Sequence, residues 1–295
     1  MSEAGIKGVL LFSTIVSKGK IRRLINLNAR SQGFILAVDN KENITAIAEA
    51  ANSVGSSIDM LLDIEIGGKR TGISDPRHVV TLAKYINKQA GSNFIGLQAY
   101  NGSFQTTTNY ADRLRLQSEA TETLSNVLLA LNDHDIVPEV VSGGGTGTYA
   151  IDCYLGKFTE SQAGTYIFLD TNYMNTHFEE TISCPFEKAL TVATSVISTS
   201  SPDYIITDAG LKEFSREHLA PQIITAPAIG YDYELVGDDL GRIITPRNLL
   251  RPKIGDILEC LTPHCYATLN LYTVYHCVRN DTLVDIWSID ARDQS

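Results

Sequence analysis

The strongest constraint on the fold is an alternation, across the first 170 residues, of short apolar segments with longer amphipathic ones. Helical patterns at 41–53, 75–90 and 110–133 separate several of the apolar segments. Strands joined by such long crossovers pair in parallel. The pattern therefore predicts a parallel α/β sheet, either part of a β/α barrel or doubly wound. The six apolar segments that read as strands are 8–14, 34–39, 59–65, 94–100, 138–143 and 165–170.

Polar residues collect where these expected strands end. In β/α barrels the carboxyl ends of the strands carry the active site. We therefore expect a functional edge formed by Asp39, Glu65 with Arg70, Gln98 with Tyr100, a glycine-rich loop, and Asp170.

The glycine-rich loop spans residues 142–148, Ser-Gly-Gly-Gly-Thr-Gly-Thr. Glycines allow backbone amides to turn inward around an anion, and the hydroxyls of Thr146 and Thr148 are possible further donors. A flexible strand-to-helix turn has the same composition, and neither a P-loop lysine nor dinucleotide-binding spacing is present. Taken alone, the loop leaves both interpretations open.

The sequence pattern changes after Cys184, where strand and turn signals replace the helical patterns. The segments that read as strands are 186–200, 204–207, 230–236, 242–244, 254–258, 270–278 and 282–289. They predict an antiparallel β domain. The expected domains are thus 1–183, a β/α sheet, and 184–295, a β domain.

Charge and cysteine content limit the partners and the compartment. A formal net charge of −10 repels nucleic acid and anionic membranes, so neither is expected as a partner. The five cysteines form no Cys-x-x-Cys pair and suit a reducing compartment, so a cytoplasmic location is expected. No apolar run approaches the ~18 residues that a membrane helix needs.

Several blocks together resemble the fold-type III pyridoxal-phosphate proteins of the D-threonine aldolase and D-serine dehydratase group. The resemblance covers nearly the whole chain, and it implies an eight-stranded β/α (TIM-type) barrel followed by a β domain. The blocks are Gly-Leu-Gln-Ala-Tyr at 96–100, the glycine loop at 142–148, Ala-Gly-Thr-Tyr-Ile-Phe-Leu-Asp at 163–170, Asp-Ala-Gly-Leu-Lys at 208–212, Pro-His-Cys-Tyr-Ala-Thr-Leu-Asn-Leu-Tyr at 263–272, and Val-Arg-Asn at 278–280.

The resemblance implies a function as well as a fold. It points to a pyridoxal 5'-phosphate lyase that cleaves D-3-hydroxy amino acids, such as D-threonine to glycine and acetaldehyde. A D-serine dehydratase-like ammonia-lyase and a truncated protein without catalysis are the alternatives. The partner would be a small D-amino acid, and a homodimer is expected because dimers are common in the family.

The resemblance also assigns site residues. The loop residues Gly143, Gly144, Gly145, Thr146 and Gly147 would hold the cofactor phosphate, and Arg70 would approach the pyridine ring. The pocket would be lined by Gln98, Tyr100 and Tyr166. The competing interpretations are that Arg70 pairs with Glu65 and that the two tyrosines are barrel aromatics.

Two departures from the family pattern lead us to expect impaired catalysis. The family's Schiff-base lysine lies in a segment resembling Pro-His-x-Lys-Thr-His, which this sequence lacks. At ~30 residues per βα unit, six strands leave a barrel short of about two N-terminal units. We therefore expect an N-terminally truncated barrel with open edges at 8–14 and 165–170. Lys18, Lys20 and Lys69 show no mark of a replacement nucleophile.

The second departure concerns the metal. The family places a divalent ion on a histidine and on an aspartate or cysteine two residues later. Here His264 is kept, but Tyr266 occupies the second position, and a neutral phenol is a poor ligand for manganese, zinc or magnesium. Cys265 would point to the opposite face of an extended segment. A degenerate metal site is expected, as is the loss of a polar group at Leu240, where the family usually has histidine.

Overall fold

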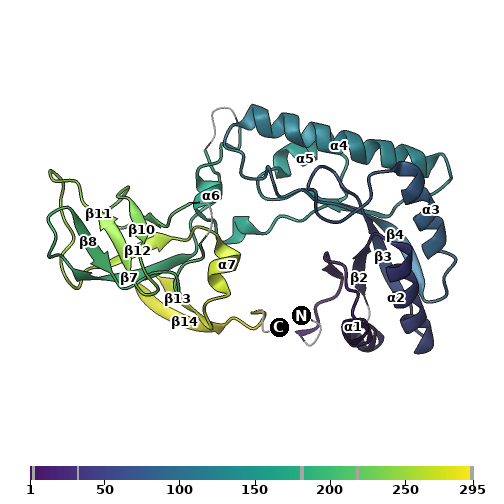
Figure 1. Cartoon of the computed structure of the whole chain (residues 1–295), viewed down its shortest axis with the longest axis horizontal. Helices are drawn as coiled ribbons and strands as arrows, with labels where there is room; N and C mark the ends of the chain where they lie inside the picture. Colours follow the sequence, from purple (N-terminus) through teal and green to yellow (C-terminus); the bar gives the residue numbers. More distant parts are fainter. Residues whose placement is uncertain (2–3, 32, 180–182, 217–218, 293–295) are drawn as a thin grey trace. The chain divides into compact units, whose positions relative to one another are not determined.

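The computed structural model describes residues 1, 4–31, 33–179, 183–216 and 219–292. The chain divides into two compact units, Met1–Ala163 and Gly164–Ser295 (Figure 1). This division lies before the domain boundary that the sequence predicted at 183/184. That boundary stays a prediction.

The first unit is built on one six-stranded sheet in which every neighbouring pair is parallel. Its strands lie in the order β1-β2-β3-β4-β5-β6. In a doubly wound sheet the order of the strands reverses at a point inside the sheet, so that the first strand lies in the middle. The sequential order therefore decides between the two predicted alternatives in favour of a half-barrel. The strands are β1 (Val9–Leu11), β2 (Phe34–Val38), β3 (Ile58–Asp63), β4 (Ser92–Ala99), β5 (Val140–Gly143) and β6 (Glu160–Ser161).

Helices connect these strands, as the amphipathic stretches predicted. Several begin at a side-chain cap that satisfies a free backbone amide. Asn40 caps α2 by accepting from the Asn43 amide at 2.8 Å, and Asn109 caps α4 by accepting from the Asp112 amide at 3.0 Å. Asp75 caps α3 ahead of a proline in its first turn. The helices are α1 (Lys18–Ser31), α2 (Lys41–Ser53), α3 (Pro76–Ile86), α4 (Tyr110–Asn132) and α5 (Tyr149–Leu155).

The core of the first unit lies between the sheet and these helices. Leu36, Met60 and Leu97 from three adjacent strands are fully buried against Ile47 of α2 and Leu124 of α4. One face of β3, formed by Ile58, Met60 and Leu62, belongs to this core, while the alternate positions are Asp59, Leu61 and Asp63.

The expected strand at 165–170 is wrong. The sixth strand is instead β6, only two residues long, and residues Thr165–Ile167 form a 3-10 turn in the second unit. Leu169 there adopts a positive φ of 59°, which breaks an extended strand. Asp170 caps the following helix α6 (Thr171–Met174) by accepting from the Tyr173 amide. The edges of the parallel sheet are thus β1, as predicted, and β6.

The second unit is an antiparallel β domain, as the sequence predicted. Its six-stranded sheet has the order β10-β11-β8-β7-β12-β9, and β13 and β14 form a separate hairpin. The short helix α7 (Cys265–Leu269) follows β12. The strands are β7 (Thr191–Ser198), β8 (Tyr204–Thr207), β9 (Gln222–Ile223), β10 (Tyr233–Leu235), β11 (Gly241–Ile244), β12 (Ile257–Leu261), β13 (Val274–Arg279) and β14 (Thr282–Ser288).

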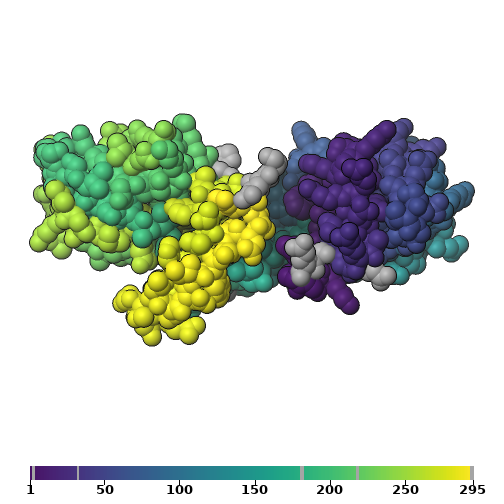
Figure 2. Space-filling model, turned by 90° about the horizontal axis from the view of Figure 1, so that it is seen from below, coloured from purple at the N-terminus to yellow at the C-terminus, as the bar shows by residue number. Residues whose placement is uncertain are grey.

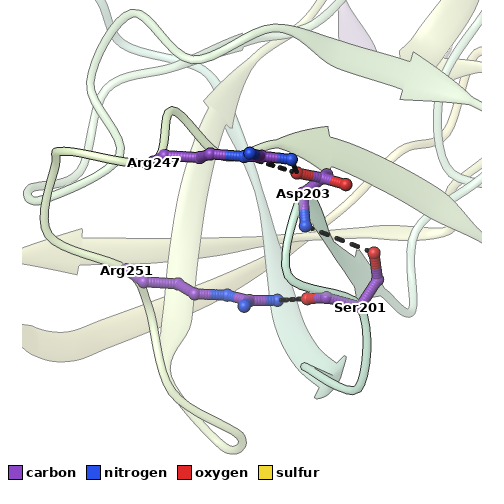
Figure 3. A network of polar contacts seen from close by, with 4 residues as sticks. All are labelled: Ser201, Asp203, Arg247 and Arg251. Atoms are coloured by element: carbon purple, nitrogen blue, oxygen red, sulfur yellow. Dashed lines mark hydrogen bonds and ion pairs between the residues drawn. The ribbon is translucent and has the colours of Figure 1, made fainter.

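The connection between β7 and β8 is held by two arginines from a loop beyond β11 (Figure 3). Arg247 binds the Asp203 carboxylate at 2.9 Å. Arg251 donates to the carbonyls of Thr199 at 3.2 Å, Tyr204 at 2.7 Å, and Ser201. One guanidinium thereby satisfies three carbonyls that no strand partner covers.

Every residue of β14 is exposed, and the C-terminal segment that contains the hairpin lies on the surface of its unit (Figure 2). Across the described ranges, no helix is long and apolar enough to cross a membrane.

Candidate functional site

Most of the polar residues predicted at strand ends lie at one edge of the sheet in the first unit, whereas Asp170 lies in the second unit. Asp63, Gln98 and the glycine loop lie at the ends of β3, β4 and β5, and Asp39 follows β2. The strand register places Gln98 beside both Asp63 and Ser142. The loop after β3 returns to this edge, where the Gly72 amide donates to Asp39 at 3.1 Å.

Gln98 and Asp63 form a buried polar pair. The Gln98 amide nitrogen donates to the Asp63 carboxylate at 3.1 Å and to the Phe12 carbonyl at 3.1 Å. Burial raises the pKa of Asp63 above its ordinary value, against the opposing effect of hydrogen bonds from Thr71 and Gln98. The Gln98 side-chain oxygen is buried without a hydrogen-bond partner among the described residues. An unmatched buried acceptor costs free energy unless a ligand supplies a donor.

Arg70 lies over Tyr100 and not in an ion pair with Glu65. Its guanidinium donates to the Tyr100 carbonyl at 3.3 Å and sits 5.2 Å from the centre of the Tyr100 ring. Glu65 instead accepts from the backbone amides of Gly67 and Arg70, which folds the loop around its carboxylate. The competing interpretation of Arg70 as the ion-pair partner of Glu65 is therefore wrong, while a role toward a pyridine ring stays a prediction. Burial raises the pKa of Tyr100, which keeps its phenol protonated.

The glycine loop is packed too closely for any side chain at its glycines. A Cβ at Gly143 would stand 2.2 Å from the Ala99 carbonyl oxygen, and one at Gly145 would stand 2.7 Å from the Gln105 side chain. Gly144 also has a positive φ of 64°. Residues 142–148 are all buried, Thr146 among them. The loop is therefore a fixed structure, unlike the flexible turn that composition alone allowed.

Thr148 does not act as the additional donor that the sequence suggested. Its hydroxyl donates to Asp152 at 2.7 Å and accepts from the Gly145 amide at 3.1 Å and from Gln105 at 3.0 Å. A hydroxyl has one proton and two lone pairs, so this one is fully used. Sequence reasoning missed Gln105 and Asp152. The i, i+4 spacing from Thr148 could have pointed to Asp152, but no spacing signal links Gln105 to the loop.

Tyr166 belongs to the second unit. Its ring packs on Phe186, with 5.7 Å between ring centres, and 45% of its surface is exposed. Its predicted place in a cofactor pocket stays a prediction.

The residues predicted for a metal also lie in the second unit. His264 is the residue immediately before α7, and its ring meets the Tyr266 ring edge to face at 5.6 Å between centres. Cys265 is in the first turn of α7, so the extended geometry assumed for it is wrong. Burial raises the pKa of the Cys265 thiol to about 12.

Asp170 is a carboxylate in contact with this group. It is fully buried, and accepts from the amides of Tyr173 at 3.2 Å and Cys265 at 3.3 Å. Burial raises its pKa, partly offset by those bonds and by the charge of His264. Among the described residues, no group of three or more histidine, cysteine or acidic side chains could hold a metal ion.

The chain matches two family models. Residues 1–172 match the alanine racemase N-terminal domain, and residues 189–278 match a serine dehydratase domain.

Comparison with individual proteins gives the same family. The chain is 32% identical to a D-threonine aldolase of Arthrobacter sp over 98% of its own length and 75% of that protein. It is 31% identical to a 3-hydroxy-D-aspartate aldolase of Paracoccus denitrificans (strain Pd 1222), over 99% and 75%. The crystal structure of D-threonine aldolase from Filomicrobium marinum superposes with a TM-score of 0.91 at 30% identity, covering 99% of this chain and 78% of the other.

Proposed function

The chain belongs to the alanine racemase N-terminal family, within the fold-type III pyridoxal-phosphate proteins, and we propose from this membership that it binds pyridoxal 5'-phosphate and acts on D-3-hydroxy amino acids as a D-threonine aldolase-like lyase. The observation that carries the proposal is the buried glycine loop at the carboxyl end of β5, in a chain that matches an aldolase over nearly its whole length.

The residues of the first unit fit the cofactor. The unmatched oxygen of Gln98 offers a buried acceptor beside the carboxyl ends of the strands. The glycine loop from Gly143 to Gly147, with Thr146, would hold the phosphate, while Arg70 and Tyr100 would face the ring. When bound, the cofactor supplies an electron sink for breaking a bond at the substrate α-carbon.

The chain's own groups have defined tasks in this proposal. Arg70 keeps a positive charge beside Tyr100, where it would orient an anionic ligand group. The Tyr100 phenol, protonated because of its raised pKa, is a hydrogen-bond donor at neutral pH.

A divalent metal does not fit the described residues. His264 is a good ligand, but Tyr266 supplies a phenol, which is a poor ligand for such ions, and the Cys265 side chain is buried in the first turn of α7. We therefore propose that any metal-assisted polarisation of the substrate hydroxyl is weak in this chain, and that turnover is low for that reason.

The test is formation of glycine from D-threonine by the purified chain, with pyridoxal 5'-phosphate and Mn²⁺ added. We expect cofactor retention in equilibrium dialysis and slow cleavage that Mn²⁺ changes little. L-threonine is the matched control and should give no glycine. Absence of cofactor binding would refute the proposal, and fast Mn²⁺-dependent cleavage would refute the statement about the metal.

A dehydratase is the second candidate, supported by the match of residues 189–278 to a serine dehydratase domain. Release of ammonia from D-serine under the same conditions would favour it over the aldolase. A small-molecule D-amino acid is the proposed partner in either case. A homodimer and a cytoplasmic location stay predictions.

A further inference from the structure

A layer of polar side chains packs against the glycine loop, and the proposed cofactor contacts include none of them. These side chains come from the segment after β4, from α4 and from the start of α5, and each is buried. They are Gln105, Arg113, Gln117, Thr148 and Asp152.

Thr148 is the centre of this layer. Its hydroxyl proton goes to Asp152, and its two lone pairs accept from the Gly145 amide and the Gln105 side chain. Asp152 also accepts from the Gln117 amide nitrogen. Asp152 therefore fixes the direction of the Thr148 hydroxyl, and this direction fixes which loop amide Thr148 can bind.

Gln105 links Thr148 to the backbone of Gly147. Its amide nitrogen points to Thr148, so its oxygen is left to accept from the Gly147 amide at 3.0 Å. The Gly147 carbonyl in turn accepts from the fully buried Arg113 at 2.8 Å. The backbone of Gly147 is thus held on both its amide and its carbonyl.

Close packing leaves no room for a side chain at two of these glycines. A Cβ at Gly144 would stand 2.1 Å from an Asp152 carboxylate oxygen, and one at Gly147 would stand 1.7 Å from the Gln105 carbonyl oxygen. The conformation of the loop is therefore supported by contacts within the chain. Supporting a binding loop in this way reduces the free energy that binding spends on ordering it.

We propose that Asp152 is a positioning residue for phosphate binding: through Thr148 and Gln105 it holds the glycine loop in the conformation that receives the phosphate group. The proposal rests on the proposed function, because it takes the ligand to be a pyridoxal-type phosphate ester. It adds that recognition of the phosphate depends on a hydrogen-bond network that does not itself touch the ligand.

The test compares pyridoxamine 5'-phosphate with pyridoxamine. The two probes differ only in the phosphate group, and neither carries the aldehyde that surface lysines capture. Their dissociation constants are measured by equilibrium dialysis for the full chain and for Thr148→Val, Thr148→Ser and Asp152→Asn. We expect Thr148→Val and Asp152→Asn to weaken the phosphorylated probe about tenfold, from loss of a buried hydrogen bond, and pyridoxamine hardly at all. Thr148→Ser keeps the hydroxyl and should bind as the parent does.

A double variant provides a rescue. In Asp152→Asn, one carboxylate oxygen becomes an amide NH₂, which cannot accept a hydrogen bond. Either Gln117 or Thr148 therefore loses its acceptor. Adding Gln117→Glu converts the donor at 117 into an acceptor, so Asp152→Asn with Gln117→Glu should recover most of the lost affinity. The control is Thr194→Val, which removes a hydrogen bond of 2.9 Å from the buried Thr194 to the exposed Asp208 in the second unit and should leave both dissociation constants unchanged.

The outcomes separate this proposal from the proposed function. If the parent binds the phosphate ester more tightly than pyridoxamine and the variants keep that preference, the positioning role is wrong and the cofactor proposal stands. A parent without such a preference would refute the cofactor proposal and the positioning role together. Equal weakening of both probes, or no rescue in the double variant, would show a general loss of structure and would overturn the positioning role alone.

Discussion

The side-chain amide of Gln98 donates a hydrogen bond to the Asp63 carboxylate across 3.1 Å, joining β4 to β3 at their carboxyl ends. Burial raises the pKa of Asp63 above its ordinary value of 3.8. The folded state therefore holds this proton more tightly than the unfolded chain does. The free energy of unfolding should fall as pH rises from the ordinary value through the raised one.

The substitution Asp63→Asn removes that ionisation. We expect the decline of stability with rising pH to become shallower, but to persist in part because burial raises the pKa of Asp152 as well. Urea unfolding at a series of pH values from about 3.5 to 7 measures the slope. Asp75→Asn is the control of opposite sign. The pKa of Asp75 is lowered by the Arg77 amide bond, so its contribution is lost as pH falls. An unchanged slope in Asp63→Asn would contradict the assignment.

Gly147→Ala should destabilise the first unit by about 2 kcal/mol or more, because the new methyl group collides with backbone and not with a movable side chain. Thermal unfolding measures the effect. Gly19→Ala in α1 is the control, since a Cβ at Gly19 meets nothing within 4 Å and alanine favours a helix. A Gly147→Ala chain as stable as the parent would mean that the loop is not held as described.

Tyr266→Asp should create a carboxylate two residues after His264 and so raise the affinity for Mn²⁺. Because 49% of the Tyr266 surface is exposed, the smaller side chain should leave folding intact. Isothermal titration with Mn²⁺ and the rate of D-threonine cleavage are the measurements. Tyr266→Phe, which adds no ligand, should bind metal no better than the parent. Unchanged affinity in Tyr266→Asp would show that more of the site than this one residue differs from a metal centre.

Arg251→Ala should destabilise the second unit by about 1–3 kcal/mol, because three carbonyls lose one shared donor. Arg251→Lys should recover only part, since all three bonds come from one guanidinium nitrogen, which the shorter lysine side chain does not reach. Arg247→Ala is the matched control: its ion pair with Asp203 is largely exposed, and such pairs contribute little. Equal losses in both alanine variants would contradict this ranking.

Sequence patterns predicted most of the fold, because the formation of most strands and helices depends on residues that are neighbours in the chain. The apolar segment 34–39 and the amphipathic stretch 41–53 became β2 and α2, with Asn40 as the cap between them. The sixth strand was missed because β6 is two polar residues, Glu160 and Ser161, which carry no apolar signal. The helix α7 was read as extended because five residues are too few to show a helical period.

The site was predictable only in part, for a similar reason. Gln98 and the glycine loop stand where strands end, which a sequence shows. Asp152 and Gln105 act on the loop through Thr148, and Gln105 lies 43 residues from Thr148 in the chain. Only folding brings that pair together, so no spacing rule could have assigned it.

The strand order of the first unit also bears on how the chain folds. Each strand from β2 to β6 pairs with the strand made just before it, so every added strand closes a loop that holds a single crossover. Parallel pairing across a crossover is slow compared with the closing of a hairpin. The half-sheet can therefore grow one βα unit at a time during synthesis, and the glycine loop takes its place only after β4 offers an edge for β5 to pair with.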